Sequence, residues 1–303
     1  MNLRKDVPFN KRKMSFSASD VIIFTILSLF FLISLYPFYN MLIMSFARFE
    51  DVARPGLYIW PKYISFINYQ VIFSDPALMR AFGVSFFIAV AGTSLAMFVT
   101  TTAAYALSKK VLPGRKGLMV IYVITMYFSG GLIPWYLVLR DLGFVDNILV
   151  MIIPSCFSVF SMILMRNYFN SIPDALEESA KIDGANDIRI LVQIILPVAK
   201  PILATITLFY AVAYWNEWWH GMLFIVRNTN IQPLQLLLRR IVVDATVDLG
   251  NDMRHQLQRA NVMIHRPSIQ MASVTVATIP IMLVYPFVQK HFAKGIMLGS
   301  VKA

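Results

Sequence analysis

The apolar residues of this 303-residue chain are gathered into long blocks, and its charged residues lie between the blocks. Hydrophobic residues make up 58% of the chain and charged residues 14%, against roughly a quarter charged in soluble domains. A helix needs about 20 apolar residues to cross a bilayer core. The sequence therefore predicts an all-α integral membrane protein with six transmembrane helices. The predicted spans are Val21–Phe46, Ala81–Leu107, Leu118–Leu139, Ile148–Met165, Ile202–Ile225 and Met271–Val288.

Helix-breaking residues interrupt two of the predicted spans. Ser129-Gly130-Gly131 and Pro134 lie in the third span, and Pro280 and Pro286 lie in the sixth. Such breaks are tolerated within a bilayer where neighbouring helices satisfy the freed backbone groups. The second span carries a run of small residues, which suits close contact between helices. Both features indicate a packed bundle. The small residues are Ala89, Ala91, Gly92, Ser94 and Ala96.

Basic and weakly charged connections alternate along the chain. Both tails and the connection after the second span are rich in Lys and Arg, whereas the connection after the third span has only Arg140 beside two aspartates. Because Lys and Arg in short loops favour the cytoplasmic side, both termini are expected in the cytoplasm. The predicted order is a cytoplasmic tail at 1–20, a first transmembrane helix at 21–46, an extracytoplasmic segment at 47–77, a main transmembrane domain at 78–290 with an extracytoplasmic loop at 226–270, and a cytoplasmic tail at 291–303.

Several functions are not expected from this sequence. The formal net charge is +11, but nucleic-acid binding needs a folded basic face, and the basic residues here lie in short segments beside apolar blocks. The four histidines lack the spacing of metal ligands, so no metal site is predicted. A P-loop needs Gly-Lys before Ser or Thr, and that dipeptide does not occur. The chain itself is therefore not expected to hydrolyse ATP, act as an enzyme or hold a cofactor.

The connection between the fourth and fifth spans, at 171–197, has the signals of folded structure. Ser171 and Asp174 fit the spacing of a capping box at the start of a helix. Gly184 can supply the left-handed residue that ends this helix, and Asn186 can cap a second helical run. The sequence predicts two short helices joined by a tight glycine turn at the cytoplasmic surface.

The first of these helices is acidic, with Asp174, Glu177, Glu178 and Asp183 against Lys181. A helix that lies on lipid headgroups usually carries Lys and Arg on its polar face. A groove in a partner protein is therefore the better interpretation.

Two short motifs stand in the same segment. The first is Glu178-Ser179-Ala180 followed after two residues by Asp183-Gly184-Ala185, and the second is Ile194-Ile195-Leu196-Pro197. They resemble the EAA loop of ABC importer permeases, in which Glu-Ala-Ala precedes Asp-Gly-Ala and, later, Ile-x-Leu-Pro. Ser179 departs from the usual alanine, a small-for-small change. The ending at 292–302 resembles the maltose-type permeases of carbohydrate importers, and the likeness covers the chain from about residue 78.

The run from Tyr127 to Pro134 is Tyr-Phe-Ser-Gly-Gly-Leu-Ile-Pro. It resembles one branch of that family, associated with oligosaccharides released from complex polysaccharides. The resemblance thus implies an oligosaccharide as the carbohydrate substrate.

The resemblance also implies a transporter of several subunits in a bacterial cytoplasmic (inner) membrane, each with its own role. The region 78–290 would be the transmembrane domain of an ABC type I importer permease. Its partners would be a second, similar permease subunit, two ATP-binding subunits that use ATP-Mg, and an extracytoplasmic solute-binding protein that delivers the sugar. The EAA loop would couple the permease to the ATPase. The residues implied in coupling are Glu178, Ser179, Ala180, Asp183, Gly184, Ala185, Leu196 and Pro197.

Aromatic and polar residues close the fifth span, in the order Trp215-Asn216-Glu217-Trp218. Aromatic residues at this depth are typical of an interfacial belt. The alternative is a wall of the sugar pathway, since aromatic faces stack on sugar rings. Glu217 is the most informative of the four, because an acid near the membrane is normally paired or functional.

The loop at 226–270 contains several arginines, among them Arg239, Arg240 and Arg254. They fit either a solvated loop of mixed charge or a docking surface for the binding protein. Because the planar guanidinium suits carboxylates, they also raise the expectation of an acidic oligosaccharide.

Two other classes of membrane protein compete with an ABC permease. An ion-coupled secondary transporter often shows internal repeats and intramembrane acids, but no repeat is visible here and the span centres lack carboxylates. A membrane scaffold without transport activity is the other alternative. A co-purifying ATPase would separate the three.

Overall fold

The computed structural model describes residues 18–47, 60, 63–243 and 266–295. Within these residues every regular element is helical, in agreement with the predicted all-α class. The helices are α1 (Ala18–Phe46), α3 (Ile67–Ser74), α4 (Pro76–Ser108), α5 (Arg115–Tyr127), α6 (Leu132–Asp141), η1 (Ile148–Met151), α7 (Val159–Asn170), α8 (Asp174–Ile182), α9 (Asp187–Ile190), η2 (Leu191–Ile195), α10 (Leu196–Val198), α11 (Lys200–Trp215), α12 (Trp219–Phe224), η3 (Thr229–Ile231), α13 (Leu234–Val243) and α15 (Arg266–Gly295).

The predicted spans differ in how continuous they are. Within the described residues, α1 and α4 are each long and apolar enough to cross a membrane, and two bent helix pairs could each form one more span. One pair is α5 with α6, which meet at a bend of 111°. The other joins Asp187–Val198 to Lys200–Phe224 at 87°. By contrast, α15 continues through Pro280 and Pro286, where the sequence suggested a break.

The fourth predicted span was wrong as a continuous helix. Only η1 and α7 are helical between residues 148 and 170, and Pro154 lies in the turn between them. Proline has no backbone N–H and cannot continue a helical ladder. A new helix then starts where the Ser158 hydroxyl caps α7 by accepting from the Ser161 N–H at 3.3 Å.

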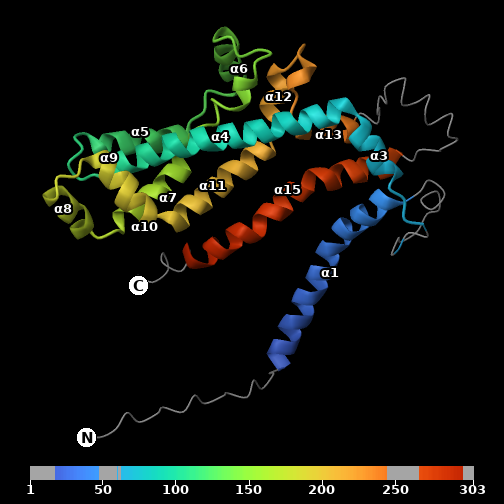
Figure 1. Cartoon of the computed structure of the whole chain (residues 1–303), viewed down its shortest axis with the longest axis horizontal. Helices are drawn as coiled ribbons and strands as arrows, with labels where there is room; N and C mark the ends of the chain where they lie inside the picture. The colour runs from blue at the N-terminus through green and yellow to red at the C-terminus, as the bar shows by residue number, and fades with distance from the viewer. Residues whose placement is uncertain (1–17, 48–59, 61–62, 244–265, 296–303) are drawn as a thin grey trace, which may run out of the picture.

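The core forms around α4, which runs the length of the bundle beside α11 (Figure 1). Gly92 of α4 packs directly against Tyr214 of α11. The Tyr214 hydroxyl donates to the Ile152 carbonyl at 2.9 Å. Further along, the Thr100 and Tyr210 hydroxyls are 2.6 Å apart. The predicted close packing of small residues on the second span is therefore confirmed at Gly92.

The first helix stands apart from this bundle. Most of α1 extends away from the other helices (Figure 1), and only its last turns pack against α3 and α15. There the Asn68 amide donates to the Ser45 and Ala47 carbonyls at 2.9 and 3.2 Å. The Ser45 hydroxyl also lies 2.7 Å from the Tyr69 hydroxyl. Most side chains along the rest of α1 are apolar and exposed.

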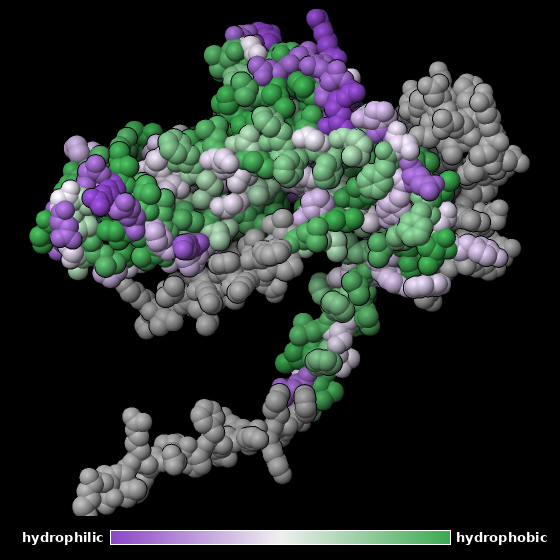
Figure 2. All heavy atoms as spheres, in the orientation of Figure 1, coloured by the Kyte–Doolittle hydropathy of each residue, from purple (hydrophilic) through white to green (hydrophobic). Residues whose placement is uncertain are grey.

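Hydrophilic and hydrophobic residues are unevenly distributed over the surface. Hydrophilic residues gather near α8 at one end and over α6 and its neighbours at another, with largely hydrophobic surface between them (Figure 2). An apolar band between two polar regions is the surface that a bilayer requires.

A substitution at Gly92 tests the packing of α4 on α11. A Cβ added there would lie 2.7 Å from the Tyr214 ring, which is buried and held by its bond to Ile152. We expect Gly92→Ala to destabilise the protein by about 1–3 kcal/mol, as overpacking does. Thermal unfolding of the purified protein in detergent measures the effect.

Gly83→Ala on the same helix is the matched control, because a Cβ there meets no atom within 4 Å. An unchanged or higher Tm is expected for it. Equal Tm values for the two variants would contradict the close contact between α4 and α11.

Candidate functional site

The segment between α7 and α11 folds as the predicted pair of short helices. The first helix, α8, ends at a glycine turn in which Gly184 has φ +77°. The Gly184 N–H donates to the Lys181 carbonyl at 3.0 Å, and the Ala185 N–H donates to the Ala180 carbonyl at 2.9 Å. These two bonds form a Schellman motif. Asn186 then caps α9, its side chain accepting from the Arg189 N–H at 2.8 Å.

The predicted capping box at the start of α8 was wrong. The Ser171 hydroxyl donates to the Tyr168 carbonyl at 2.7 Å, within the last turn of α7. Pro173 precedes α8, and no side chain caps that helix. The serine takes the nearer carbonyl because it still belongs to the end of α7.

The acidic residues of α8 divide into two groups. Asp174 pairs with Lys110 at 2.7 Å, and Glu177 pairs with Lys109. Both lysines follow the end of α4, so half of the predicted partner-facing charge is instead used within the chain. Glu178 and Asp183 are exposed.

These ion pairs act on the pKa values of their members. The hydrogen bond and charge of Lys110 lower the pKa of the Asp174 carboxyl. Burial by itself lowers the pKa of the Lys109 ammonium, but hydrogen bonds to Glu177 and Tyr105 outweigh it and the pKa is raised. The Asp174 carboxyl and the Lys109 ammonium are therefore both charged at neutral pH.

Apolar side chains lie beside the exposed acids of the helix pair. Ile182 at the end of α8 is 87% exposed and Ile188 in α9 is 74% exposed. Ala180 and Ile190 turn inward and are buried. Exposed apolar residues rimmed by charge mark a protein interaction surface. We call the exposed residues Glu178, Ile182, Asp183 and Ile188 the docking face.

The other predicted coupling residues take different positions in the segment. Ser179 is exposed, whereas Ala185 and Leu196 are half-buried. Leu196 and the exposed Pro197 form α10, after the π-helical turn η2. They follow the docking face rather than contribute to it.

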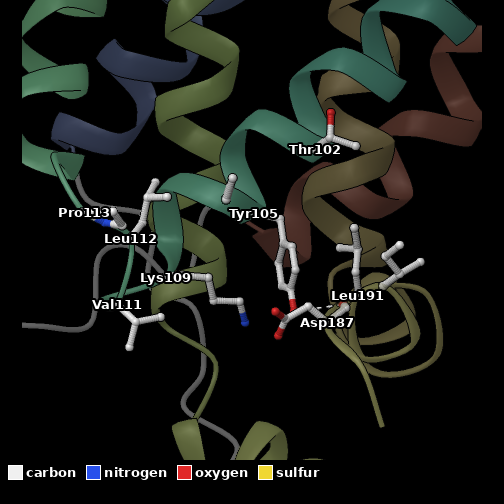
Figure 3. Close-up of a pocket in the computed structure, with 10 residues that line it drawn as sticks. Thr102, Tyr105, Lys109, Val111, Leu112, Pro113, Asp187 and Leu191 are labelled. Carbon is white, nitrogen blue, oxygen red and sulfur yellow. Dashed lines mark hydrogen bonds between the residues drawn. The ribbon is translucent and has the colours of Figure 1, made fainter.

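A hollow lies between the end of α4 and the start of α9 (Figure 3). Its volume is about 460 Å³, and Tyr105, Lys109, Asp187 and Leu191 are among its lining residues. The Tyr105 hydroxyl donates to the Asp187 carbonyl at 3.2 Å. The Lys109 ammonium lies 4.0 Å from the centre of the Tyr105 ring. The structure thus joins α4, α8 and α9 at one point.

The four candidate pathway residues at the end of α11 do not form one surface. Trp215 is buried, and its indole N–H donates to the Ala277 carbonyl of α15 at 3.1 Å. Asn216 is exposed, and its amide donates to the Val212 carbonyl at 3.0 Å. Glu217 is buried and accepts from the His220 N–H at 2.8 Å, with its other oxygen 2.9 Å from His220 Nδ1.

Trp218 contacts one of the predicted docking arginines. The Arg239 guanidinium lies 4.1 Å above its ring centre, within the range of a cation–π contact. Arg240 donates to the Gln232 side chain at 3.0 Å. Both arginines are exposed. The third, Arg254, lies outside the described residues.

Asp146 is a structural residue that the sequence reasoning missed. Its carboxylate accepts from the backbone N–H groups of Val226, Arg227 and Asn228 at 2.9, 2.8 and 3.1 Å. These bonds lower the pKa of the carboxyl and tie the loop after α6 to the turn after α12. Lys109 and Tyr105 were missed as well. Lys109 and Lys110 were used only to predict which side of the membrane their loop occupies. The residues next to them in the sequence do not indicate that they pair with α8.

No protein-family model matches the chain. The polygalacturonan/rhamnogalacturonan transport system permease protein of Bacillus subtilis (strain 168) is 42% identical over 285 residues, covering 93% of this chain and 98% of that protein. A solved bacterial ABC transporter involved in the import of the acidic polysaccharide alginate contains a chain with 34% identity and a TM-score of 0.85, covering 92% of this chain and 99% of that one.

A second solved structure is the bacterial alginate ABC transporter in complex with alginate pentasaccharide-bound periplasmic protein. One of its chains shares the fold, with 17% identity and a TM-score of 0.59, over 89% of this chain and 93% of that one. Two proteins can share a fold at much lower sequence identity than the 42% that this chain shares with nearly the whole length of a transport permease. Identity this high indicates membership of the same family. The chain belongs to the family of membrane permease subunits of sugar-importing ABC transporters.

Proposed function

We propose that this chain gates an oligosaccharide pathway while a partner subunit hydrolyses ATP. The observation that carries the mechanism is the docking face on α8 and α9. It combines exposed carboxylates with exposed isoleucines on a short helix whose end is fixed by the Gly184 turn. A helix of this kind suits a groove in a partner protein. The sequence has no Gly-Lys dipeptide for a P-loop, and ATP-Mg is proposed to be used by two ATP-binding partner subunits.

The proposed arrangement in the membrane has six spans and both termini in the cytoplasm. The spans are α1, α4, the α5–α6 pair, the η1–α7 segment, the α11–α12 pair and α15. The alternation of basic connections supports this orientation. It puts α8 and α9 on the cytoplasmic side and the region 226–270, which includes α13, on the outer side.

A second permease subunit is proposed to cover the break between α5 and α6. Tyr127 and Phe128 are 80% and 77% exposed, and the backbone from Phe128 to Gly130 is not helical. Irregular backbone at membrane depth is tolerated only where protein buries it or where it lines a water-filled cavity. The break therefore faces either the partner subunit or the sugar path between the two permeases. It is a better candidate for the pathway wall than Trp215, which holds α11 to α15.

The proposed substrate is an acidic oligosaccharide delivered by an extracytoplasmic binding protein. One relative is named for polygalacturonan and rhamnogalacturonan, and one structural neighbour imports the acidic polysaccharide alginate. Exposed arginines on the proposed outer side, Arg227, Arg239 and Arg240, fit an anionic ligand or an acidic face of the binding protein.

Substitutions at the Gly184 turn and at Glu178 test the coupling role. A Cβ at residue 184 meets no atom within 4 Å, so Gly184→Val should act only through the backbone, by roughly 1–2 kcal/mol. Glu178→Lys reverses the charge of the docking face. We expect both proteins at normal membrane abundance but without bound ATPase subunits or sugar uptake.

Gly184→Asn and Glu178→Gln are the matched controls. Asparagine tolerates the left-handed conformation, and glutamine removes the charge without reversing it. Both controls should retain most of the ATPase. Normal uptake by Gly184→Val and Glu178→Lys would show that this segment does not couple transport to ATP hydrolysis.

Labelling of single cysteines tests the proposed orientation. Lys116 at the start of α5 and Thr229 after α12 are both exposed. In a Cys156→Ser background, a membrane-impermeant maleimide should label Thr229→Cys in intact cells and Lys116→Cys only after lysis. Labelling of both from outside would exclude the six-span arrangement.

Uptake assays test the substrate class. Cells with the intact transporter should import uronate-containing oligosaccharides, and Arg239→Gln should reduce that import. Import restricted to short neutral sugars would refute the acidic substrate while leaving the permease function in place.

A further inference from the structure

The end of α4 carries two contacts that reach different halves of the coupling segment. Lys109, directly after the helix, pairs with Glu177 of α8. Tyr105, one turn earlier, donates to the Asp187 carbonyl of α9 at 3.2 Å. The Lys109 ammonium also lies 4.0 Å from the centre of the Tyr105 ring, so the two contacts support each other (Figure 3). We propose that Lys109 and Tyr105 are positioning residues that transmit the movement of α8 and α9 to α4. This inference rests on the proposed coupling function.

Burial distinguishes the Lys109 pair from its neighbour in sequence. The side chains of Lys109 and Glu177 are 16% and 23% exposed, whereas those of Lys110 and Asp174 are 76% and 70% exposed. A solvent-exposed ion pair contributes little to stability because water screens it. Removing one member of a shielded pair leaves the other charge poorly solvated, which is much less favourable. The first pair can therefore hold α8 against α4, and the second is a natural control.

The end of α4 is itself held rigid. The Arg166 side chain of α7 donates to the Leu107 carbonyl at 2.8 Å, and Arg115 donates to the Ser108 carbonyl at 3.1 Å. These bonds use carbonyl groups that have no partner within the last turn of a helix. A force applied through Lys109 therefore acts on a fixed helix end rather than a frayed one.

The other end of α4 reaches the proposed outer surface. With 33 residues at 1.5 Å each, the helix is about 50 Å long. Near its start, the Ser85 hydroxyl accepts from the Leu234 N–H of α13 at 2.8 Å, and Arg80 pairs with Asn230. One continuous helix thus connects the coupling pair to α13, which carries Arg239 and Arg240. Movement of α8 would reach the surface where the binding protein is proposed to dock.

A second mechanical route runs through the covalent chain. It leads from α9 through η2 and α10 to α11, but the two arms meet at an 87° bend near Ala199. A π-helical turn and a sharp bend transmit force less directly than a straight helix. If this route is nevertheless sufficient, Lys109 will be dispensable for coupling.

The test uses the complete transporter, with its ATPase subunits and binding protein, reconstituted in proteoliposomes. The variants are Lys109→Gln and the charge swap Lys109→Glu/Glu177→Lys, with Lys110→Gln as the exposed control. For each, the readouts are membrane abundance, bound ATPase, ATP hydrolysis stimulated by the sugar-loaded binding protein, and sugar imported per ATP. A purely structural role would change abundance without changing the last ratio.

We expect Lys109→Gln to keep its ATPase subunits but to import about tenfold less sugar per ATP, as loss of a shielded charge pair suggests. The swap should recover part of this loss, and Lys110→Gln should stay within about twofold of the wild type. A normal ratio in Lys109→Gln, a loss equal to that of Lys110→Gln, or loss of the ATPase subunits would overturn the proposal.

Tyr105→Phe decides the question if Lys109→Gln does not reach the membrane. It keeps the buried ring and removes only the hydroxyl, with its hydrogen bonds to the Asp187 carbonyl and to Lys109, so the protein should fold. A reduced ratio of sugar to ATP supports transmission through α4, and an unchanged ratio refutes it. Failure of the proposed function itself gives a different result, since Glu178→Lys would then transport normally.

Discussion

Every backbone N–H and C=O group in the hydrocarbon core of a bilayer needs a hydrogen-bond partner within the protein or in a water-filled cavity. Long helices such as α1 and α4 meet this requirement by themselves. Among the described residues, regular helix is interrupted at several places, including the bend after Tyr127, Pro154 and the end of α11. At Pro154 and after α11, the chain's own groups take part, as in the bond from Tyr214 to the Ile152 carbonyl. At the bend after Tyr127, the Gly131 N–H donates to the Ser129 hydroxyl at 3.2 Å, but residues 127–131 are exposed. The need to cover this backbone is the physical reason to expect a second permease.

Hydrogen bonding of backbone groups also determines the structure of α8 and α9 at the proposed cytoplasmic end. The turn at Gly184 uses the last carbonyls of α8, and the Asn186 side chain accepts from the Arg189 N–H in the first turn of α9. Because these backbone groups are bonded within the segment, the side chains of the docking face are left for a partner. Asp174 and Glu177 pair with the two lysines after α4, so this surface carries less net charge than the sequence of α8 alone indicates. A partner groove must therefore match Ile182 and Ile188 as well as Glu178 and Asp183.

Turns and helix caps formed by residues close in sequence were predictable, whereas contacts between residues far apart in sequence were not. The left-handed Gly184 and the cap at Asn186 follow from residues within a few positions of each other, and both were predicted. The Ser171 cap failed because the hydroxyl has a competing carbonyl in α7. Hydropathy identified the fourth apolar block but gave no weight to Pro154. The contacts from Glu177 to Lys109 and from Trp215 to Ala277 join residues far apart in sequence, which periodicity cannot match. The predicted family is confirmed by the comparisons, while the coupling role stays a prediction.

The central claim is that ATP hydrolysis in a partner drives transport through this chain. The most direct measurement is sugar uptake by proteoliposomes that contain the complex purified through a tag on this chain. ATP enclosed with the ATPase subunits should support uptake only when the binding protein is present, and a proton or sodium gradient without ATP should support none. Uptake driven by an ion gradient in the absence of ATP would contradict the account.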